Sequence, residues 1–156
     1  MKKCLLLIIV LLPSLRMAAQ NLSGSWEEKE NSKALSSLIF KQNGTMSLHI
    51  FIEKAQDDGT LISGTLSVPG SYTRAGQMVY IRFASNKLTI NYDDKRMQKI
   101  SEEERAAALY AIELYRQSFS ANWPQSATMR IKSITAKEMV VELLGQDRKY
   151  RRVASH

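Results

Sequence analysis

Apolar and polar residues alternate with a period of two along much of the chain after residue 20. Leu48, Ile50 and Ile52 alternate with mostly polar neighbours, and residues 78–83 show the same pattern. Because successive side chains of a β-strand point to opposite faces, this period predicts strands with one face toward an interior and one toward water. The expected strands span residues 26–30, 35–41, 46–54, 61–68, 78–83, 88–92, 127–134, 139–144 and 149–153.

Turn-forming dipeptides separate these strands. Asn43-Gly44 and Asp58-Gly59 favour the type I′ turns that join the two strands of a hairpin. Pro69-Gly70 predicts a break after the strand at 61–68, and Ala75-Gly76 predicts a further turn. Short strands between regularly spaced turns are typical of an antiparallel meander.

One segment departs from this period and predicts an inserted α-helix over residues 101–119. Ser101 and Glu104 have the spacing of a capping box, in which each side chain bonds the other's backbone N–H. Tyr110 and Leu114 lie opposite the main apolar stripe, so the pattern also allows a second face of this helix to be covered by the rest of the protein. The main stripe comprises Ala108, Leu109, Ile112, Tyr115 and Phe119.

The N-terminus has the three parts of a secretory signal peptide. Lys2 and Lys3 precede an apolar run over residues 5–12, and the small residues Ala18 and Ala19 follow. The run is too short to span a bilayer, which needs about twenty apolar residues. We therefore expect a signal peptide over 1–19, a domain over 20–156, and export to the periplasm or the exterior, with no transmembrane segment in the mature form.

Composition changes once that segment is removed. The full chain of 156 residues has 22 Lys and Arg, 15 Asp and Glu and a formal charge of +7; Lys2, Lys3 and Arg16 carry three of those positive charges, so the mature charge is +4. Cys4, the single cysteine, is also lost. The mature chain therefore has no disulfide, thiol nucleophile or thiolate ligand.

Several short motifs resemble those of lipocalins and other calycins. Residues 22–26 (LSGSW) contain the G-x-W signature of the first strand, and residues 40–45 (FKQNGT) resemble the F-x-x-x-G-T hairpin of bacterial lipocalin-like domains. Gly70-Ser71-Tyr72 followed by Gly76 and residues 80–83 is similar to another segment of those domains. Residues 134–143 with 150–153 resemble their last hairpin.

The resemblance implies an antiparallel up-and-down β-barrel of about eight strands whose interior holds one small apolar ligand. The helix before residue 127 departs from the lipocalin pattern and would lid the barrel mouth or plug it. The resemblance also implies that Trp26 closes one end of the barrel under an arginine of the last strand, as a cation–π contact. Arg151 and Arg152 are both candidates, because the pattern does not say which faces inward.

The candidate chemistry does not indicate an enzyme. There is no G-x-S-x-G motif, and the histidines are His49 in an expected strand and His156 at the terminus. The acidic pairs Asp57-Asp58 and Asp93-Asp94 fall where turns are expected. We expect no catalytic activity, no metal site and no cofactor.

The basic run at residues 148–152 places four cations around Tyr150. Such a run could follow a phosphate backbone, but the modest mature charge and export favour an edge strand whose charges resist edge pairing. An anionic lipid or glycan surface stays open as a partner, whereas nucleic acid is not expected.

The sequence thus predicts an exported, non-catalytic, lipocalin-like protein that holds a small apolar or amphipathic molecule in its barrel. The alternative is a filled barrel that contacts a protein or glycan through its loops and its basic last strand. Tyr72, Tyr92 and Tyr110 are candidates to supply hydroxyls at the barrel mouth. The candidate ligand-binding residues are Leu48, Ile50, Ile52, Leu66, Tyr72, Val79, Ile81, Phe83, Ile90, Tyr92, Met129, Ile131, Val141 and Leu143.

Overall fold

The computed structural model describes residues 21–30, 33–55, 61–92, 97–143 and 145–154. The expected signal peptide and the pairs Asp57-Asp58 and Asp93-Asp94 lie outside these ranges. The described elements are β1 (Gly24–Glu30), β2 (Lys33–Phe40), β3 (Thr45–Ala55), β4 (Leu61–Ala75), β5 (Met78–Phe83), the short 3₁₀ helix η1 (Ser85–Lys87), β6 (Thr89–Tyr92), α3 (Glu102–Asn122), β7 (Ser126–Ile134), β8 (Glu138–Leu143) and β9 (Gln146–Val153).

Eight of the strands close into an antiparallel barrel. The hydrogen-bonded order runs β3-β2-β1-β9-β8-β7-β5-β4, and β3 also pairs with β4, which completes the ring. Most barrel strands pair with the strand that precedes or follows them in the sequence. Two pairings differ: β5 pairs with β7, because β6 and α3 lie between them in the sequence, and the first strand β1 pairs with the last strand β9. The predicted up-and-down barrel of about eight strands with one inserted helix is confirmed.

The hairpin predicted at Asn43-Gly44 is present, but its turn is not the two-residue type I′ turn. β2 ends at Phe40 and β3 begins at Thr45, and Gly44 has a φ of +80°. The side-chain Oδ1 of Asn43 accepts a hydrogen bond from the Thr45 amide at 3.1 Å. A connection of this length uses the left-handed conformation at the glycine alone.

The break predicted at Pro69-Gly70 is wrong, because β4 continues through both residues to Ala75. At this point β4 exchanges one neighbour for another, from β6 over residues 64–67 to β5 over residues 70–75. Pro69 lies between the two pairings, where the missing N–H of proline costs no bond on that side. A Cβ on Gly70 would lie 2.6 Å from the Arg82 carbonyl oxygen, so the close approach of β5 requires glycine here.

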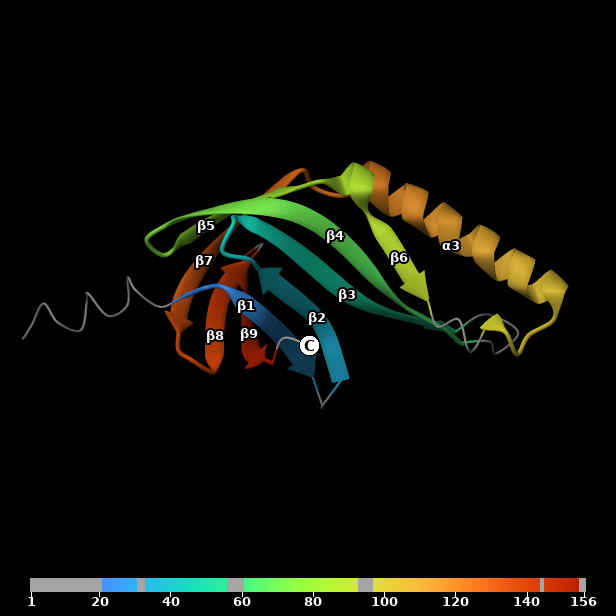
Figure 1. The fold of residues 1–156 in the computed structure, drawn as a ribbon, viewed down its shortest axis with the longest axis horizontal. Coiled ribbons are helices and arrows are strands. Elements are labelled where there is room, and N and C mark those ends of the chain that lie inside the picture. The colour runs from blue at the N-terminus through green and yellow to red at the C-terminus, as the bar shows by residue number, and fades with distance from the viewer. Residues whose placement is uncertain (1–20, 31–32, 56–60, 93–96, 144, 155–156) are drawn as a thin grey trace, which may run out of the picture.

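β3 and β4 extend beyond the barrel at one end. β2 pairs with β3 only as far as Ser36 opposite Ile50, whereas the β3–β4 pairing continues to Ala55 opposite Leu61. β6 adds to the free side of β4, and α3 contacts β6 and η1 (Figure 1). The extension thus consists of three strands with a helix beside the edge strand, and edge strands are commonly covered in this way.

The helix begins with the predicted capping box. The Ser101 hydroxyl accepts from the Glu104 amide, and the Glu104 carboxylate accepts from the Ser101 amide at 2.9 Å. Ala108 and Ile112 are buried, whereas Tyr110 is 68% exposed and Leu114 49% exposed. Within the described residues, the main stripe of α3 is therefore buried only at Ala108 and Ile112, while Leu109, Tyr115 and Phe119 are 36–38% exposed and the second apolar side faces solvent.

Candidate functional site

The two ends of the barrel differ in how their interiors are filled. A large cluster, here called the barrel core, contains Trp26 and extends to the end at which β1 begins and β9 ends. A smaller cluster, here called the mouth cluster, lies at the opposite end, where the extension leaves the barrel. The barrel core consists of Leu22, Trp26, Leu38, Phe40, Met46, Val79, Ile81, Met129, Ile131, Ile134, Met139, Val141 and Tyr150.

Trp26 seals the first end, which we call the closed end. Its indole Nε1–H donates to the Leu22 carbonyl oxygen at 2.8 Å, and its side chain is fully buried. The Arg152 guanidinium carbon lies 4.2 Å from the centre of the Trp26 ring, a cation–π distance. Nη1 and Nη2 of Arg152 donate to the carbonyl oxygens of Ser23 at 3.0 Å and Asn21 at 2.7 Å.

Of the two arginines that the sequence left open, Arg152 is the one that covers Trp26. The two residues are directly paired between β1 and β9 and therefore share the inner face. Arg151 faces outward with its side chain 67% exposed, and its Nε lies 3.6 Å from Glu138. Arg151 takes no part in closing the barrel.

Tyr72 lies at the closed end and not at the mouth, contrary to its expected role there. Its hydroxyl donates to the Lys41 carbonyl oxygen at 2.9 Å in the turn between β2 and β3. Its ring meets the edge of Phe40 with centroids 4.9 Å apart. Tyr110 was also expected to serve the mouth, but it lies on the exposed side of α3.

The other end, which we call the open end, has an apolar interior that is only partly covered. The mouth cluster has three buried members, Leu66, Val68 and Leu88, and several half-buried neighbours. Tyr92 continues this face beyond Ile90 and borders a hollow of about 270 Å³ that Met97, Gln98, Arg105 and Leu109 complete. The half-buried neighbours are Leu48, Ile50, Ile52, Phe83, Ile90 and Trp123.

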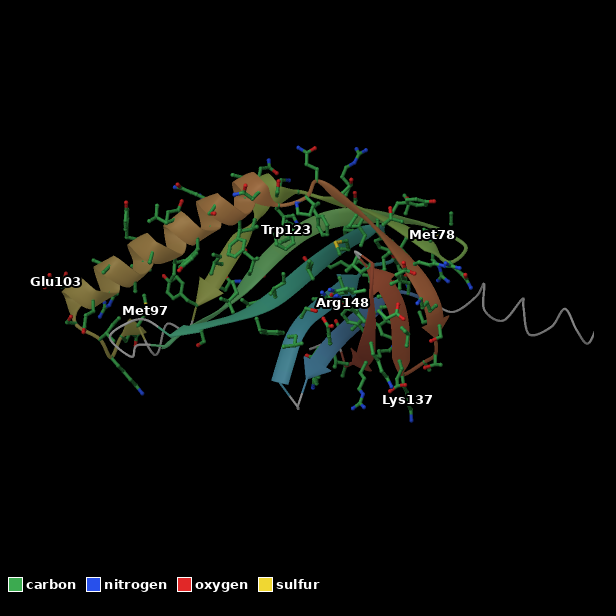
Figure 2. The ribbon with its side chains drawn as sticks, turned by 180° about the vertical axis from the view of Figure 1, so that it is seen from behind. Met78, Met97, Glu103, Trp123, Lys137 and Arg148 are labelled. Carbon is green, nitrogen blue, oxygen red and sulfur yellow. The ribbon has the colours of Figure 1, made fainter. Side chains whose placement is uncertain are left out.

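Trp123 brings the end of the helix to this mouth. It directly follows α3, and its ring meets Phe83 edge-on with centroids 5.9 Å apart. Figure 2 shows Trp123 at the end of α3 nearer the barrel, with Glu103 at the far end. Its indole Nε1 is buried and has no hydrogen-bond partner among the described residues. Trp123 therefore packs against the mouth cluster, whereas α3 itself contacts η1 and β6.

A polar cluster lies beside the mouth cluster on the inner face of β1, β2 and β9. The Ser36 hydroxyl donates to Glu28 Oε2 at 2.8 Å, and Arg148 Nη1 donates to the same oxygen at 3.0 Å. Tyr150 pairs with Glu28 across the strands, and burial raises the pKa of the Tyr150 phenol above its usual value of 10.0. Tyr150 is therefore uncharged at neutral pH.

The guanidinium of Arg148 is incompletely bonded. Its Nη2 reaches Gln146 Oε1 at a long 3.4 Å, and its Nε is buried without a partner among the described residues. The side chain of Glu28 is 14% exposed and that of Arg148 is 34% exposed. An ion pair with one buried free donor is unusual, because buried N–H groups are nearly always bonded.

The expected position of the basic last strand at the edge of the sheet is wrong. β9 pairs with β1 on one side and with β8 on the other, so it is not an edge strand. Arg148 and Arg152 face the interior, and Lys149 and Arg151 both lie near Glu138 on the outside. The four cations of this run therefore do not form one patch, because two face the barrel interior and two face the outside.

The predicted ligand-binding residues divide between the two clusters. Val79, Ile81, Met129, Ile131 and Val141 are buried members of the barrel core, with Leu143 half-buried against it. These residues fill the closed part of the interior. Leu48 and Phe83 pack against both clusters. The remaining predicted residues at the open end are Ile50, Ile52, Leu66, Ile90 and Tyr92.

Glu28, Ser36 and Trp123 were missed as site residues. The period of two contained part of the signal, because Glu28 lies two residues after Trp26 and so shares its inner face. Nothing in the sequence pattern predicts the contact between Trp123 and Phe83, which are separated in the sequence by α3. Among the described residues there is no group of three or more potential metal-ligating side chains, and no described helix is long and apolar enough to cross a membrane.

No protein-family model matches this sequence, and no curated protein matches it either. Two solved structures have a similar shape. A lipocalin-like protein from Bacteroides uniformis is 14% identical, with 85% of this chain and 98% of that chain covered and a TM-score of 0.46. An uncharacterised protein from Bacteroides eggerthii is 16% identical, with 85% and 100% covered and a TM-score of 0.47. The strand order and register themselves define the fold: a closed, antiparallel, eight-stranded β-barrel.

Proposed function

We propose that this protein is an exported, non-catalytic binding protein that holds a small apolar or amphipathic molecule at the open end of its barrel. The observation that carries the proposal is the contrast between the ends. Trp26 and Arg152 seal one end, while Ile50, Ile52 and Ile90 stay half-buried at the other. Apolar side chains that face a concave interior and are still partly exposed are the usual lining of small-molecule sites.

Export rests on the sequence of residues 1–19, with its charged start, short apolar run and small residues. Binding would need no covalent chemistry, because burial of apolar ligand surface against the mouth cluster supplies the affinity. A periplasmic or secreted carrier of this kind fits a mature chain without cysteine.

Native mass spectrometry of the mature protein, purified from its own host, tests the proposal. We expect a bound mass of lipid or metabolite size that disappears after organic extraction. The Ile90→Glu variant should lose this mass, because it places a charge in the mouth cluster. Asn91→Glu is the matched control, since Asn91 is the exposed neighbour on the opposite face of β6.

A filled barrel that acts as a protein- or glycan-interaction module is the second candidate. The exposed apolar side of α3, with Tyr110 and Leu114, is the observation that favours it. A bare polypeptide mass before extraction, with no thermal stabilisation by apolar probes, would contradict the carrier and support this module. Tyr110→Ser with Leu114→Ser would then abolish partner binding.

A further inference from the structure

One row of paired, inward-facing residues crosses six strands at the open end and changes from polar to apolar. Tyr150 pairs with Glu28, Glu28 with Ser36 and Ser36 with Ile50. Ile50 then pairs with Leu66, and Leu66 pairs with Ile90. Neighbouring strands lie about 5 Å apart, so the polar and apolar halves of this row are adjacent on one surface.

The polar half of the row has donors to spare. Arg148 Nε is buried without a partner, and Nη2 has one long contact at 3.4 Å. Trp123 Nε1 at the same end is a second buried donor without a partner among the described residues. Arg152 Nε at the closed end is also buried without a partner among the described residues, but Nη1 and Nη2 of Arg152 bond backbone carbonyls at 3.0 and 2.7 Å. Figure 2 shows Trp123 on the side of α3 and Arg148 among the barrel strands. Donors of this kind are satisfied by a ligand that brings an acceptor oxygen.

The charge of the cluster restricts the kind of acceptor. Glu28 already occupies Nη1 of Arg148, at 3.0 and 3.3 Å to its two carboxylate oxygens. The pair is neutral overall, so a ligand carboxylate at Nε would place a second negative charge beside Glu28. Like charges this close disfavour ionisation of one of them. An uncharged carbonyl oxygen meets the free donor without that penalty.

We infer that the open end selects amphipathic molecules with an uncharged carbonyl head, such as an ester, amide or ketone, over the corresponding carboxylates. The head accepts a hydrogen bond from Arg148, and the apolar tail lies along the half-buried Ile50 and Ile90. This inference rests on the proposed carrier function and specifies its ligand class.

The test compares three probes that share a ten-carbon chain by isothermal titration calorimetry on the full mature chain: decane, decanoic acid and methyl decanoate. At neutral pH we expect methyl decanoate to bind at least about tenfold more tightly than decanoate. Decanoic acid should gain affinity as the pH falls and the acid becomes protonated, while the affinity for the ester stays constant. Decanoate binding as tightly as the ester at neutral pH would overturn the inference.

Two variants test whether the Glu28–Arg148 ion pair causes the preference for the ester over decanoate. Glu28→Gln leaves the Arg148 charge without a carboxylate partner, so decanoate should become the preferred probe. Arg148→Met should bring the ester to the affinity of decane. The matched controls are Glu27→Gln and Arg151→Met, whose side chains face outward from the same two strands and should leave the wild-type order unchanged.

Arg148→Met could fail to fold because it leaves Glu28 without its cation. The double variant Glu28→Gln with Arg148→Met removes both charges and keeps the test decisive, since it should bind decane and show no preference between the ester and the acid. If all probes bind equally in wild type, the carrier function stands and the head-group inference falls. If none of the probes binds, both the carrier function and the inference are contradicted.

Discussion

The two ends of the barrel carry the same kinds of side chain in different states. Arg152 and Arg148 both face inward from β9, and each end has one of the two tryptophans. At the closed end Arg152 stacks on Trp26, and the Trp26 indole donates to Leu22. At the open end Arg148 faces Glu28 with a free Nε, and the Trp123 indole has no partner among the described residues.

This difference separates a structural end from an end suited to binding. At the closed end Arg152 donates two hydrogen bonds to backbone carbonyls, although its Nε is buried without a partner among the described residues. At the open end two buried donors, Arg148 Nε and Trp123 Nε1, are unsatisfied, which lowers stability unless something else bonds them. Two of these three unsatisfied donors therefore lie where the interior is least covered.

Trp26→Ala should have the largest effect on stability. The substitution removes a fully buried indole from the barrel core and the platform beneath Arg152. We expect the free energy of unfolding to fall by about 3–5 kcal/mol, measured by chemical denaturation. A loss below about 1 kcal/mol would contradict the view that the closed end is structural.

Arg152→Met should follow in size. It removes the cation–π contact and leaves the carbonyls of Asn21 and Ser23 without their donors. We expect a loss of about 2 kcal/mol in the free energy of unfolding. Arg151→Met is the control on the outer face and should change stability by less than about 0.5 kcal/mol. Equal effects at the two positions would show that the inward contact adds nothing.

A double-mutant cycle on Glu28 and Arg148 should show a smaller but positive coupling. Arg148→Met alone leaves a carboxylate largely buried, whereas Glu28→Gln with Arg148→Met leaves no charge. Because the arginine is one-third exposed, we expect a coupling energy of about 1–2 kcal/mol, well below that of a fully buried pair. A coupling of zero would mean that the two side chains do not interact in solution.

The phenol of Tyr150 should make stability fall at alkaline pH. Burial raises its pKa above 10.0 in the folded state, so the folded protein keeps a proton that the unfolded chain releases. Its contribution is complete below the unfolded pKa and is lost as the pH rises through the folded pKa. Compared with Tyr150→Phe, wild type should lose up to about 1.4 kcal/mol more per pH unit in that window. Parallel stability curves would contradict the buried position of this hydroxyl.

Local patterns predicted most of the fold. The period of two located the strands of the barrel, and the Ser101–Glu104 spacing located the start of α3. The continuation of β4 through Pro69-Gly70 was not predictable in this way. It depends on an exchange between β5 and β6 that is set by segments distant in the sequence.

The candidate site was less predictable than the fold, because register between distant strands determines it. Glu28 and Arg148 are 120 residues apart in the sequence. The basic run at 148–152 has the composition of a solvated surface, and only the pairing of β9 with both β1 and β8 shows that two of its cations face the interior. The apolar lining residues were identified by their alternation, but the pattern did not separate those that fill the closed end from those that border the mouth. That division follows from how far each strand extends.

The two tryptophans allow the most direct test of the central claim, that ligand binds at the open end and not at the closed end. In a ¹⁵N–¹H spectrum of the mature protein, each indole N–H gives its own signal, and single Trp→Phe variants assign the two. On addition of methyl decanoate, we expect the Trp123 signal to shift with saturation while the Trp26 signal stays in place. A shift of the Trp26 signal with an unchanged Trp123 signal would contradict the account.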